Sequence, residues 1–278
     1  MIIVCLVIYG AFFMALAGSD SVTDNIPDAR LSESDSSKGV FSLPVSAFTS
    51  EKKFLGMSEA MDYQNSAVQS FAYLRISPEN AGNYTVAQAC DLWDYVEENW
   101  IYVNDPLGPD YISTAPETIK AGLRGDCDDY AVFMSSLIMS VGGECRVISA
   151  QNPDGEEYDG HAYPELFIGS SKSGVIEICR YVSARYSCEK VYYSFNTENG
   201  NTEYWLNLDW YLTDGKDLYY YLYGDLTGWL NEYHPGRPYY NMDDPVTLYY
   251  ADGLSKTTTP GYGYYMQKIN GVDTLNVL

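Results

Sequence analysis

The stretch RGDCDDYAVFMSSLIMSVGG, residues 124–143, places a cysteine among carboxylates at the start of an apolar run. The apolar spacing predicts a helix from about Asp126 to Gly142, because glycine favours the turn that ends a helix. We expect Asp126 to cap this helix, with Asp129 completing an acidic form of the capping box. Cys127 then lies in the first turn, where free N–H groups favour a thiolate. The thiol could be a nucleophile, a metal ligand or a bystander.

One face of this helix is expected to point inward. The apolar residues that recur at helical spacing along it are Cys127, Ala131, Met134, Ile138 and Val141. Three serines lie off that stripe, at positions 135, 136 and 140. The pattern therefore predicts an amphipathic helix with Cys127 at the inward end.

Helices are predicted ahead of this stretch. The apolar spacing is helical from Ser58 to about Leu74, and again after Thr85, which is a plausible N-cap residue. The segment VNDPLGPDYISTAP, residues 103–116, is expected to be a loop because proline and glycine interrupt both helices and strands.

Mainly strands are predicted after it. CRVISA and HAYPELFIG read as two strands, and residues 175–189 as a helix. Residues 190–211 read as a hairpin with Asn199 and Gly200 at the turn. This order predicts the α+β class with an antiparallel sheet.

The N-terminal residues are predicted to direct the chain out of the cytoplasm. The apolar stretch from Ile2 to Ala17 is shorter than the roughly 20 residues that span a membrane, and Ala15-Leu16-Ala17 matches a signal-peptide cleavage pattern. We expect a secreted or surface-anchored protein that contacts the membrane only through this segment. The predicted division is 1–17 signal peptide or anchor, 18–50 flexible linker, 51–115 helical segment, 116–250 catalytic core and 251–278 C-terminal tail.

Charge narrows the range of partners. The formal net charge is −22 and the sequence pI is about 4.2. Nucleic acid is excluded as a partner because phosphate binding needs a basic patch. An acidic surface of this kind fits a protein kept soluble outside the cell.

The cysteine count suggests one free thiol. Of six cysteines, Cys5 would leave with the signal peptide, and five is an odd number for an oxidising compartment. Cys179 and Cys188 are close in sequence and are predicted to form a disulfide. Pairing of Cys90 with Cys145 would then leave Cys127 free, although buried reduced cysteines would fit the count as well.

A cysteine nucleophile needs a base and a group that orients the base. His161 begins one predicted strand, and Asp209 lies on the second arm of the predicted hairpin. Asp214 and Asp217 are the nearby alternatives to Asp209, and His234 is expected to be a loop residue. A helix would then present the thiol to an imidazole and a carboxylate on strands.

Three blocks of the sequence resemble the transglutaminase-like superfamily. They are GDCDDYA with Gly125, Cys127 and Asp129, then GHAYPEL at 160–166, then YWLNLDWY around Asp209. The stretches DYVEENWIYVNDP and HPGRPYY are also similar to secreted archaeal and bacterial members. The resemblance covers roughly residues 85–240. It implies a papain-like fold and a triad of Cys127, His161 and Asp209.

The resemblance also implies an activity. A thiol enzyme of this family cleaves or transfers amide bonds through a thioester, and we expect a cysteine peptidase or amidase. The alternatives are a protein-glutamine transglutaminase with an amine acceptor and a non-catalytic binding module on the same fold. The expected partner is a peptide or protein amide, with cell-envelope material among the candidates.

Two residues depart from the family pattern. Tyr163 stands where the family usually has tryptophan, and Pro164 follows it. Since proline donates no hydrogen bond to a strand partner, that strand is expected to be an edge strand or to carry a bulge at Pro164.

Metal chemistry is not expected. Zinc sites use several Cys or His ligands at short spacings, and the sequence has no CxxC, HxxxH or HExxH pattern. Calcium is the one metal that the acidic loop NPDGEEYDG, residues 152–160, could hold, although its spacing does not match an EF-hand. The expectation is therefore no cofactor, with calcium as the alternative.

Overall fold

The computed structural model describes residues 56–105, 111–151, 160–210, 234–239, 244–267 and 273–278. All of them belong to one unit that covers residues 51–278. The predicted signal peptide and linker, most of the acidic loop, Tyr211, Asp214 and Asp217 lie outside the described residues. None of the helices in the described ranges is long and apolar enough to cross a membrane.

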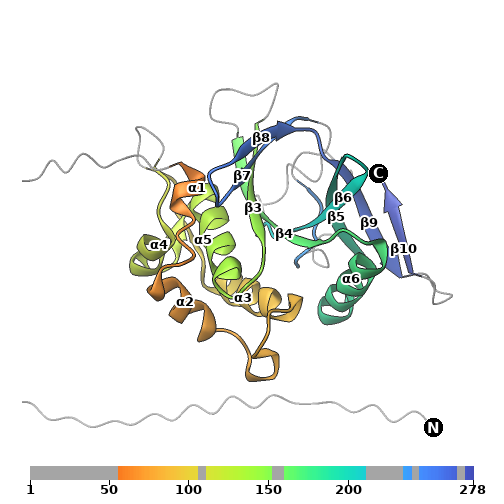
Figure 1. The fold of residues 1–278 in the computed structure, drawn as a ribbon. Coiled ribbons are helices and arrows are strands. Elements are labelled where there is room, and N and C mark those ends of the chain that lie inside the picture. Colours follow the sequence, from red (N-terminus) through yellow and green to blue (C-terminus); the bar gives the residue numbers. More distant parts are fainter. Residues whose placement is uncertain (1–55, 106–110, 152–159, 211–233, 240–243, 268–272) are drawn as a thin grey trace, which may run out of the picture. The chain divides into compact units, whose positions relative to one another are not determined.

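An eight-stranded sheet forms the frame of the fold (Figure 1). Its order is β10-β9-β5-β6-β4-β3-β7-β8, and every pair is antiparallel. The strands are β3 (Cys145–Gln151), β4 (Gly160–Gly169), β5 (Lys190–Glu198), β6 (Asn201–Asn207), β7 (Val246–Tyr250), β8 (Ser255–Thr258), β9 (Gly261–Gln267) and β10 (Asp273–Val277). Together with the helices, this sheet confirms the predicted α+β class.

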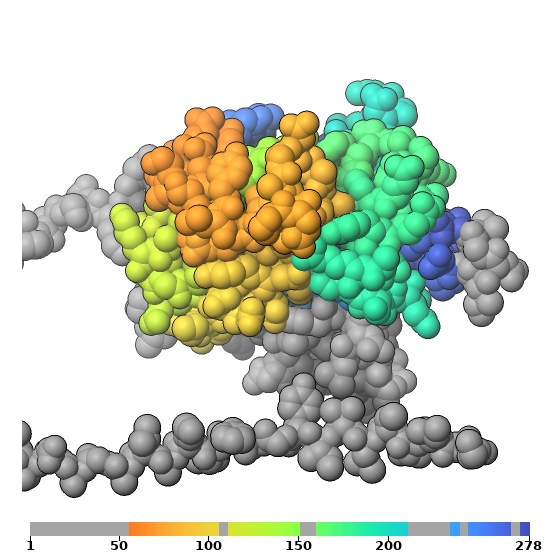
Figure 2. Space-filling view, turned by 90° about the horizontal axis from the view of Figure 1, so that it is seen from below, coloured from red at the N-terminus to blue at the C-terminus, as the bar shows by residue number. Residues whose placement is uncertain are grey.

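The helices lie on one side of this sheet. They are α1 (Met57–Ala60), α2 (Ser66–Tyr73), the short 3-10 turn η2 (Pro78–Asn80), α3 (Val86–Asn99), α4 (Ala115–Ala121), α5 (Cys127–Ser140) and α6 (Lys172–Tyr186). α1, α5 and α6 contact the strands, and α2, α3 and α4 pack on α5. α5 and α6 both share the largest apolar cluster with the strands. In the view of Figure 2, α2 and α3, in orange and yellow, lie beside α6, in green, and little of α5 reaches this surface.

Two helical predictions were wrong in detail. The helix expected from Ser58 to Leu74 is two helices, because the chain turns between Met61 and Asn65. Residues 103–116 were expected to be a loop throughout, but α4 begins at Ala115. Its start is a capping box in which Thr114 and Glu117 each bond the other's backbone N–H, with a proline in the first turn.

The helix α5 is buried all round, so the predicted amphipathic stripe was wrong. Every residue from Asp128 to Ile138 is buried, including Ser135 and Ser136. The sheet covers one side of α5, and α2, α3 and α4 cover the other. Ser136 satisfies its hydroxyl inside the helix by donating to the carbonyl of Val132 at 2.7 Å.

The predicted disulfide was also wrong. All five described cysteines are free thiols, including Cys179 and Cys188. Cys179 lies within α6, whereas Cys188 follows the left-handed residue Ser187 that ends the helix. Both thiols are buried in the apolar cluster, and burial raises the pKa of Cys179 well above its usual range.

Two predictions about strands were wrong as well. Residues 251–278 were expected to be a tail, but β8, β9 and β10 are strands of the sheet.

The strand with Pro164 was expected to be an edge strand or to be bulged there. β4 lies in the interior, and its irregularity falls between Phe167 and Gly169. The carbonyl of Pro164 accepts a hydrogen bond from the N–H of Leu208, which lies just past the end of β6. Proline has no N–H to donate in return, and none is needed here because regular pairing with β6 has ended.

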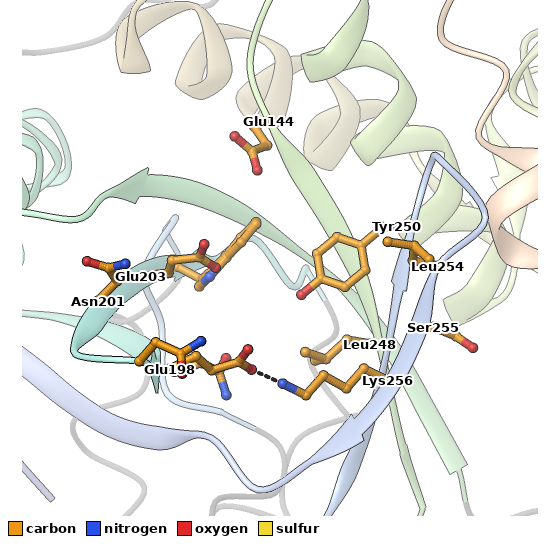
Figure 3. Close-up of a pocket in the computed structure, with 12 residues that line it drawn as sticks. Glu144, Glu198, Asn201, Glu203, Leu248, Tyr250, Leu254, Ser255 and Lys256 are labelled. Atoms are coloured by element: carbon orange, nitrogen blue, oxygen red, sulfur yellow. Dashed lines mark ion pairs between the residues drawn. The ribbon is translucent and has the colours of Figure 1, made fainter.

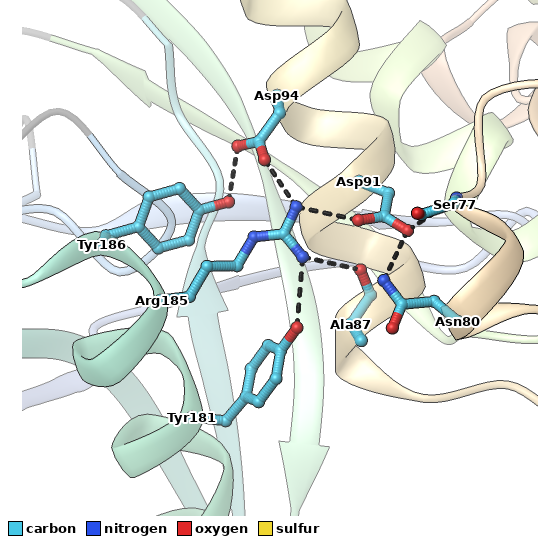
Figure 4. A network of polar contacts seen from close by, with 8 residues as sticks. All are labelled: Ser77, Asn80, Ala87, Asp91, Asp94, Tyr181, Arg185 and Tyr186. Carbon is cyan, nitrogen blue, oxygen red and sulfur yellow. Dashed lines mark hydrogen bonds and ion pairs between the residues drawn. The ribbon is translucent and has the colours of Figure 1, made fainter.

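A charged cluster joins α3 to α6 (Figure 4). The Arg185 guanidinium donates to Asp91 at 2.8 Å and to Asp94 at 2.6 Å. Asp91 also accepts from the backbone of Ser77 and the side chain of Asn80, which ties the η2 turn to the same point. Because one cation bridges three segments, this cluster fixes α6 relative to the helices that surround α5.

Candidate active site

Cys127 is the first residue of α5, as predicted. Its side chain is only partly buried, whereas the four other described cysteines are buried. The preceding strand β2 (Arg124–Gly125) pairs in parallel with β1 (Ile101–Tyr102) and directs the chain into the helix. Gly125 is required at this turn, because a Cβ there would lie 2.1 Å from Asp129 Oδ2.

The acids around Cys127 do not cap the helix, which corrects the prediction. Asp126 occupies the N-cap position but makes no side-chain capping bond. Asp129 turns away from the helix start, and its Oδ1 accepts from the backbone N–H of Ser113 at 2.6 Å. Burial raises the pKa of Asp129 to about 6, against the opposing effect of the Ser113 bonds, and the charge of Asp126 adds to the rise.

These acids form an all-oxygen group. One carboxylate oxygen from each of Asp126, Asp128 and Asp129 lies within 4.8 Å of the others. Carboxylate oxygens are the ligands that Ca²⁺ and Mg²⁺ prefer, so these are the described residues that could hold a cation. Most of the acidic loop predicted to hold calcium lies outside the described residues.

His161 and Asp209 meet at the ends of two strands. His161 is the second residue of β4, and Asp209 follows the end of β6 by two residues. The distance from His161 Nε2 to Asp209 Oδ2 is 2.7 Å, and both side chains are about 95% buried. A hydrogen bond also joins His161 to Cys127. Because Nε2 is engaged by Asp209, Nδ1 is the ring nitrogen left for the sulfur.

The surroundings favour the charged imidazole. Burial lowers the pKa of His161, but the charge and hydrogen bond of Asp209, together with Cys127, outweigh it and raise the pKa to about 10. His161 therefore carries its second proton at neutral pH. A cationic imidazole beside a cysteine sulfur stabilises a thiolate.

The position of Asp209 is fixed by side chains that sequence reasoning missed. Its N–H donates to Asn207 Oδ1 at 2.8 Å. Asn207 is fully buried, and its amide donates to the carbonyls of Arg237 at 3.3 Å and Pro238 at 3.1 Å. The polar pattern of YWLNLDWY gives no signal for this role, because the partners lie about thirty residues away.

Two buried donors hold the residue just before Asp209. The carbonyl of Leu208 accepts from Tyr130 Oη at 3.1 Å and from Trp93 Nε1 at 3.0 Å. Tyr130 lies one turn after Cys127 on α5, so the helix that carries Cys127 also helps to position the Asp209 carboxylate. Trp210 packs against Tyr130, with ring centroids 5.3 Å apart.

His234 is not part of this group. It is buried, and its ring stacks on Tyr186 at a centroid distance of 6.1 Å. Burial lowers its pKa, and the hydrogen bond to the Pro235 carbonyl only partly opposes this. The loop prediction is right for its backbone, but the ring is part of the packed interior.

The segment after His234 braces the site. Gly236 has φ +80°, and a Cβ there would lie 2.4 Å from Val191. Its N–H donates to the Asn207 carbonyl, and its own carbonyl accepts from Tyr192, both at 2.6 Å. Only glycine fits this backbone conformation at so close an approach.

An exposed apolar strip lies on the strand next to the segment that leads to Cys127. Ile101, Tyr102 and Val103 are 48%, 43% and 44% exposed, and β1 pairs with the strand that leads directly to Cys127. The Tyr102 ring packs against Trp210 at 5.9 Å between centroids. Apolar surface is therefore available next to the thiol.

Two comparisons with known proteins found a match. Residues 76–215, half of the chain, match the family model of the transglutaminase-like superfamily. A solved structure from Cytophaga hutchinsonii, described as that of a candidate cysteine protease, aligns with a TM-score of 0.34 and 13% identity. The alignment covers 79% of this chain, and the chain spans only 60% of the length of that structure. No curated protein matched the sequence.

Proposed function

Because the chain belongs to the transglutaminase-like superfamily, we propose that it is a thiol enzyme acting on amide bonds through Cys127, His161 and Asp209. The observation that carries this proposal is the buried 2.7 Å contact between His161 and Asp209, together with the hydrogen bond between Cys127 and the same imidazole. A nucleophile, its proton carrier and an orienting carboxylate are the groups that acyl transfer requires. We further propose that water is the usual acceptor, which makes the protein a cysteine peptidase or amidase.

The reaction begins with attack of the Cys127 thiolate on the amide carbon. The developing oxyanion would accept a hydrogen bond from the Cys127 backbone N–H, since the first N–H groups of a helix have no partner within it. His161 then gives its proton to the departing amine, which leaves a thioester on Cys127.

Deacylation uses the same imidazole in reverse. Neutral His161 removes a proton from the acceptor as the acceptor attacks the thioester, and Cys127 leaves as the thiolate. Asp209 keeps the ring in one orientation and stabilises its charged form through both half-reactions. With water as the acceptor the product is an acid, and with an amine it is a new amide.

Location and substrate are part of the proposal. The apolar stretch from Ile2 to Ala17 and the net charge of −22 support a secreted or surface-anchored protein. The exposed strip at 101–103 would lie along a peptide or protein chain entering from that side, with cell-envelope peptides as one source. Two alternatives stay open to the test: an amine acceptor, and a non-catalytic binding module.

Mass spectrometry of the purified full chain with a peptide library separates these outcomes. We expect mass losses and new peptide ends that need Cys127 and do not depend on added amine. Products that gain the mass of an added amine would instead indicate a transglutaminase. If wild-type protein and Cys127→Ala protein leave the library equally unchanged, the enzyme proposal fails and the binding module replaces it.

A further inference from the structure

A cavity lies at the opposite end of the central strands from His161. Its volume is about 590 Å³, which is within the range of small-molecule sites. It lies between the β5–β6 hairpin and the β7–β8 hairpin, and its lining includes Trp205, Leu248 and Tyr250 (Figure 3). Arg146 of β3 lies against Trp205, and Ala150 of β3 pairs with His161. Four strand residues separate these positions, about 13 Å.

A buried ion pair between Arg146 and Glu165 lies directly behind Trp205 and leaves no net charge there. Arg146 donates to Glu165 at 2.7 Å, to Ser194 at 3.2 Å and to Asn196 at 3.0 Å, and it is fully buried. Its guanidinium carbon lies 4.1 Å from the centre of the Trp205 ring. Arg146 and Glu165 neutralise each other, so the side chains behind Trp205 present no free charge to the cavity.

The rim offers hydrogen-bond acceptors and amides. Glu198 and Lys256 form an ion pair that joins the two hairpins (Figure 3). Glu144 and Glu203 form no ion pair with any described residue. Asn199 and Asn201 lie at the hairpin turn beside them. Burial and the charge of Glu203 raise the pKa of Glu144, so the Glu144 carboxylate would gain from a ligand that donates hydrogen bonds.

One buried donor in this cavity needs an acceptor. Trp205 is 1% exposed, and its indole Nε1 has no hydrogen-bond partner among the described residues. An ammonium or a metal ion supplies no acceptor for an indole N–H. A ligand that satisfies both Trp205 and the two glutamates must donate and accept on the same compact surface. Hydroxyl groups do both.

We propose that this cavity is a carbohydrate-binding site for a short oligosaccharide. Sugar hydroxyls would donate to Glu144 and Glu203 and accept from Trp205 Nε1, while a sugar face packs on the partly exposed Tyr250 ring. Asn196, part of the same lining, accepts from Arg146 with its Oδ1 and can donate to a hydroxyl with its amide nitrogen. The site lies away from Cys127, and it stands whether or not the amide chemistry proposed above is correct.

Isothermal titration calorimetry on the full chain tests this. Cellobiose, maltose and N,N′-diacetylchitobiose are titrated separately, and spermidine is the cationic comparison. We expect saturable binding of at least one saccharide, with an affinity that changes little between low and high salt because the ligand is neutral. Cys127→Ser should bind equally well, since the sulfur is not part of the cavity.

A matched pair of variants at one position locates the site. Leu254 is 65% exposed on the cavity lining, so replacing it should leave the fold intact. Leu254→Trp fills the opening and should lower saccharide affinity by at least about tenfold, whereas Leu254→Ala should change it by less than about threefold. Equal thermal unfolding of both variants confirms that the comparison is fair.

Two results overturn the proposal. One is the absence of saturable binding for all three saccharides. The other is salt-sensitive binding of spermidine that Glu144→Gln abolishes and no saccharide displaces, which would make the cavity a site for organic cations. Saccharide binding that both Leu254 variants leave unchanged would place the sugar elsewhere and also refute the assignment.

Discussion

Replacing Asp209 by asparagine tests the ion pair at the centre of the site. The change keeps the shape of the side chain and removes the charge that lies 2.7 Å from His161 Nε2. In the wild type the pKa of His161 is raised from 6.5 to about 10, although burial lowers it. At 1.36 kcal/mol per pKa unit, this rise is a net preference for the imidazolium of on the order of 5 kcal/mol. Asp209 and Cys127 together contribute more than this net value, because they also offset the effect of burial.

Without Asp209, burial is the strongest remaining influence on His161. We therefore expect the pKa of His161 in Asp209→Asn to fall toward or below 6.5, so that the ring is mostly neutral at pH 7. The thiolate loses its cationic partner, and the leaving amine loses its proton donor. Loss of the orienting carboxylate in such a triad lowers kcat by about two to four orders of magnitude.

The assay needs no known substrate. The rate at which iodoacetamide alkylates Cys127 is measured across pH for the wild type, for Asp209→Asn and for Glu98→Gln, an exposed acid on α3. At neutral pH the wild type and Glu98→Gln should react at the same rate, and Asp209→Asn should react more slowly because the cationic partner of the sulfur is lost. Superimposable pH profiles for the wild type and Asp209→Asn would refute the ion-pair reasoning.

A stability measurement gives the same test a second readout. A histidine whose pKa is raised on folding contributes stability that is complete below about pH 6.5 and is lost as the pH rises through the folded value, here about 10. The free energy of unfolding of the wild type should therefore fall between pH 7 and pH 10 more steeply than that of Asp209→Asn. Equal slopes for the two proteins would contradict the raised pKa.

Three further changes have defined outcomes. Cys127→Ala should abolish turnover and shift the free energy of unfolding by less than about 1 kcal/mol, because the thiol is only partly buried; activity in that variant would exclude Cys127 as the nucleophile. Asn207→Ala leaves the Asp209 N–H and two backbone carbonyls without their partner. It should therefore lower the free energy of unfolding in urea by about 1–3 kcal/mol and also lower kcat. The control Asn201→Ala, at the exposed end of the hairpin, should change neither quantity. Asp129→Asn should stabilise the fold by about 1–2 kcal/mol at pH 7, because burial raises the pKa of Asp129 from 3.8 to about 6, and the gain should vanish below about pH 4, where both side chains are neutral. A gain that persists at low pH would show that charge is not its cause.

Local signals in the sequence predicted the elements that carry the site. The apolar run after Cys127 gives α5, and Asn199-Gly200 with two positive φ angles gives the β5–β6 turn. The capping box at Thr114 and Glu117 was an equally local signal for α4. It was missed because the neighbouring prolines and glycine suggested a loop.

Other features depend on residues far apart in the sequence and could not be predicted from local pattern. Pro164 is tolerated in an interior strand because the facing strand has already ended, which follows only from the pairing of β4 with β6. Ser135 and Ser136 of α5 are buried because helices cover the side that an amphipathic pattern leaves to solvent. The cavity beside Trp205 likewise exists because the β5–β6 and β7–β8 hairpins, separated in the sheet by β4 and β3, approach each other at Glu198 and Lys256.

The carboxylates beside Cys127 can now be explained without a capping role. Asp129 packs over Gly125, where no side chain can stand, and bonds the Ser113 N–H, so it fixes the segment before α4 to the start of α5. Burial raises its pKa to about 6, which limits how strongly it is held as an anion. The cation that faces the sulfur is His161, and the pairing with Asp209 keeps it charged across the range in which Asp129 titrates. The acids are therefore not the only charges beside Cys127, because the buried imidazolium of His161 is hydrogen-bonded to it.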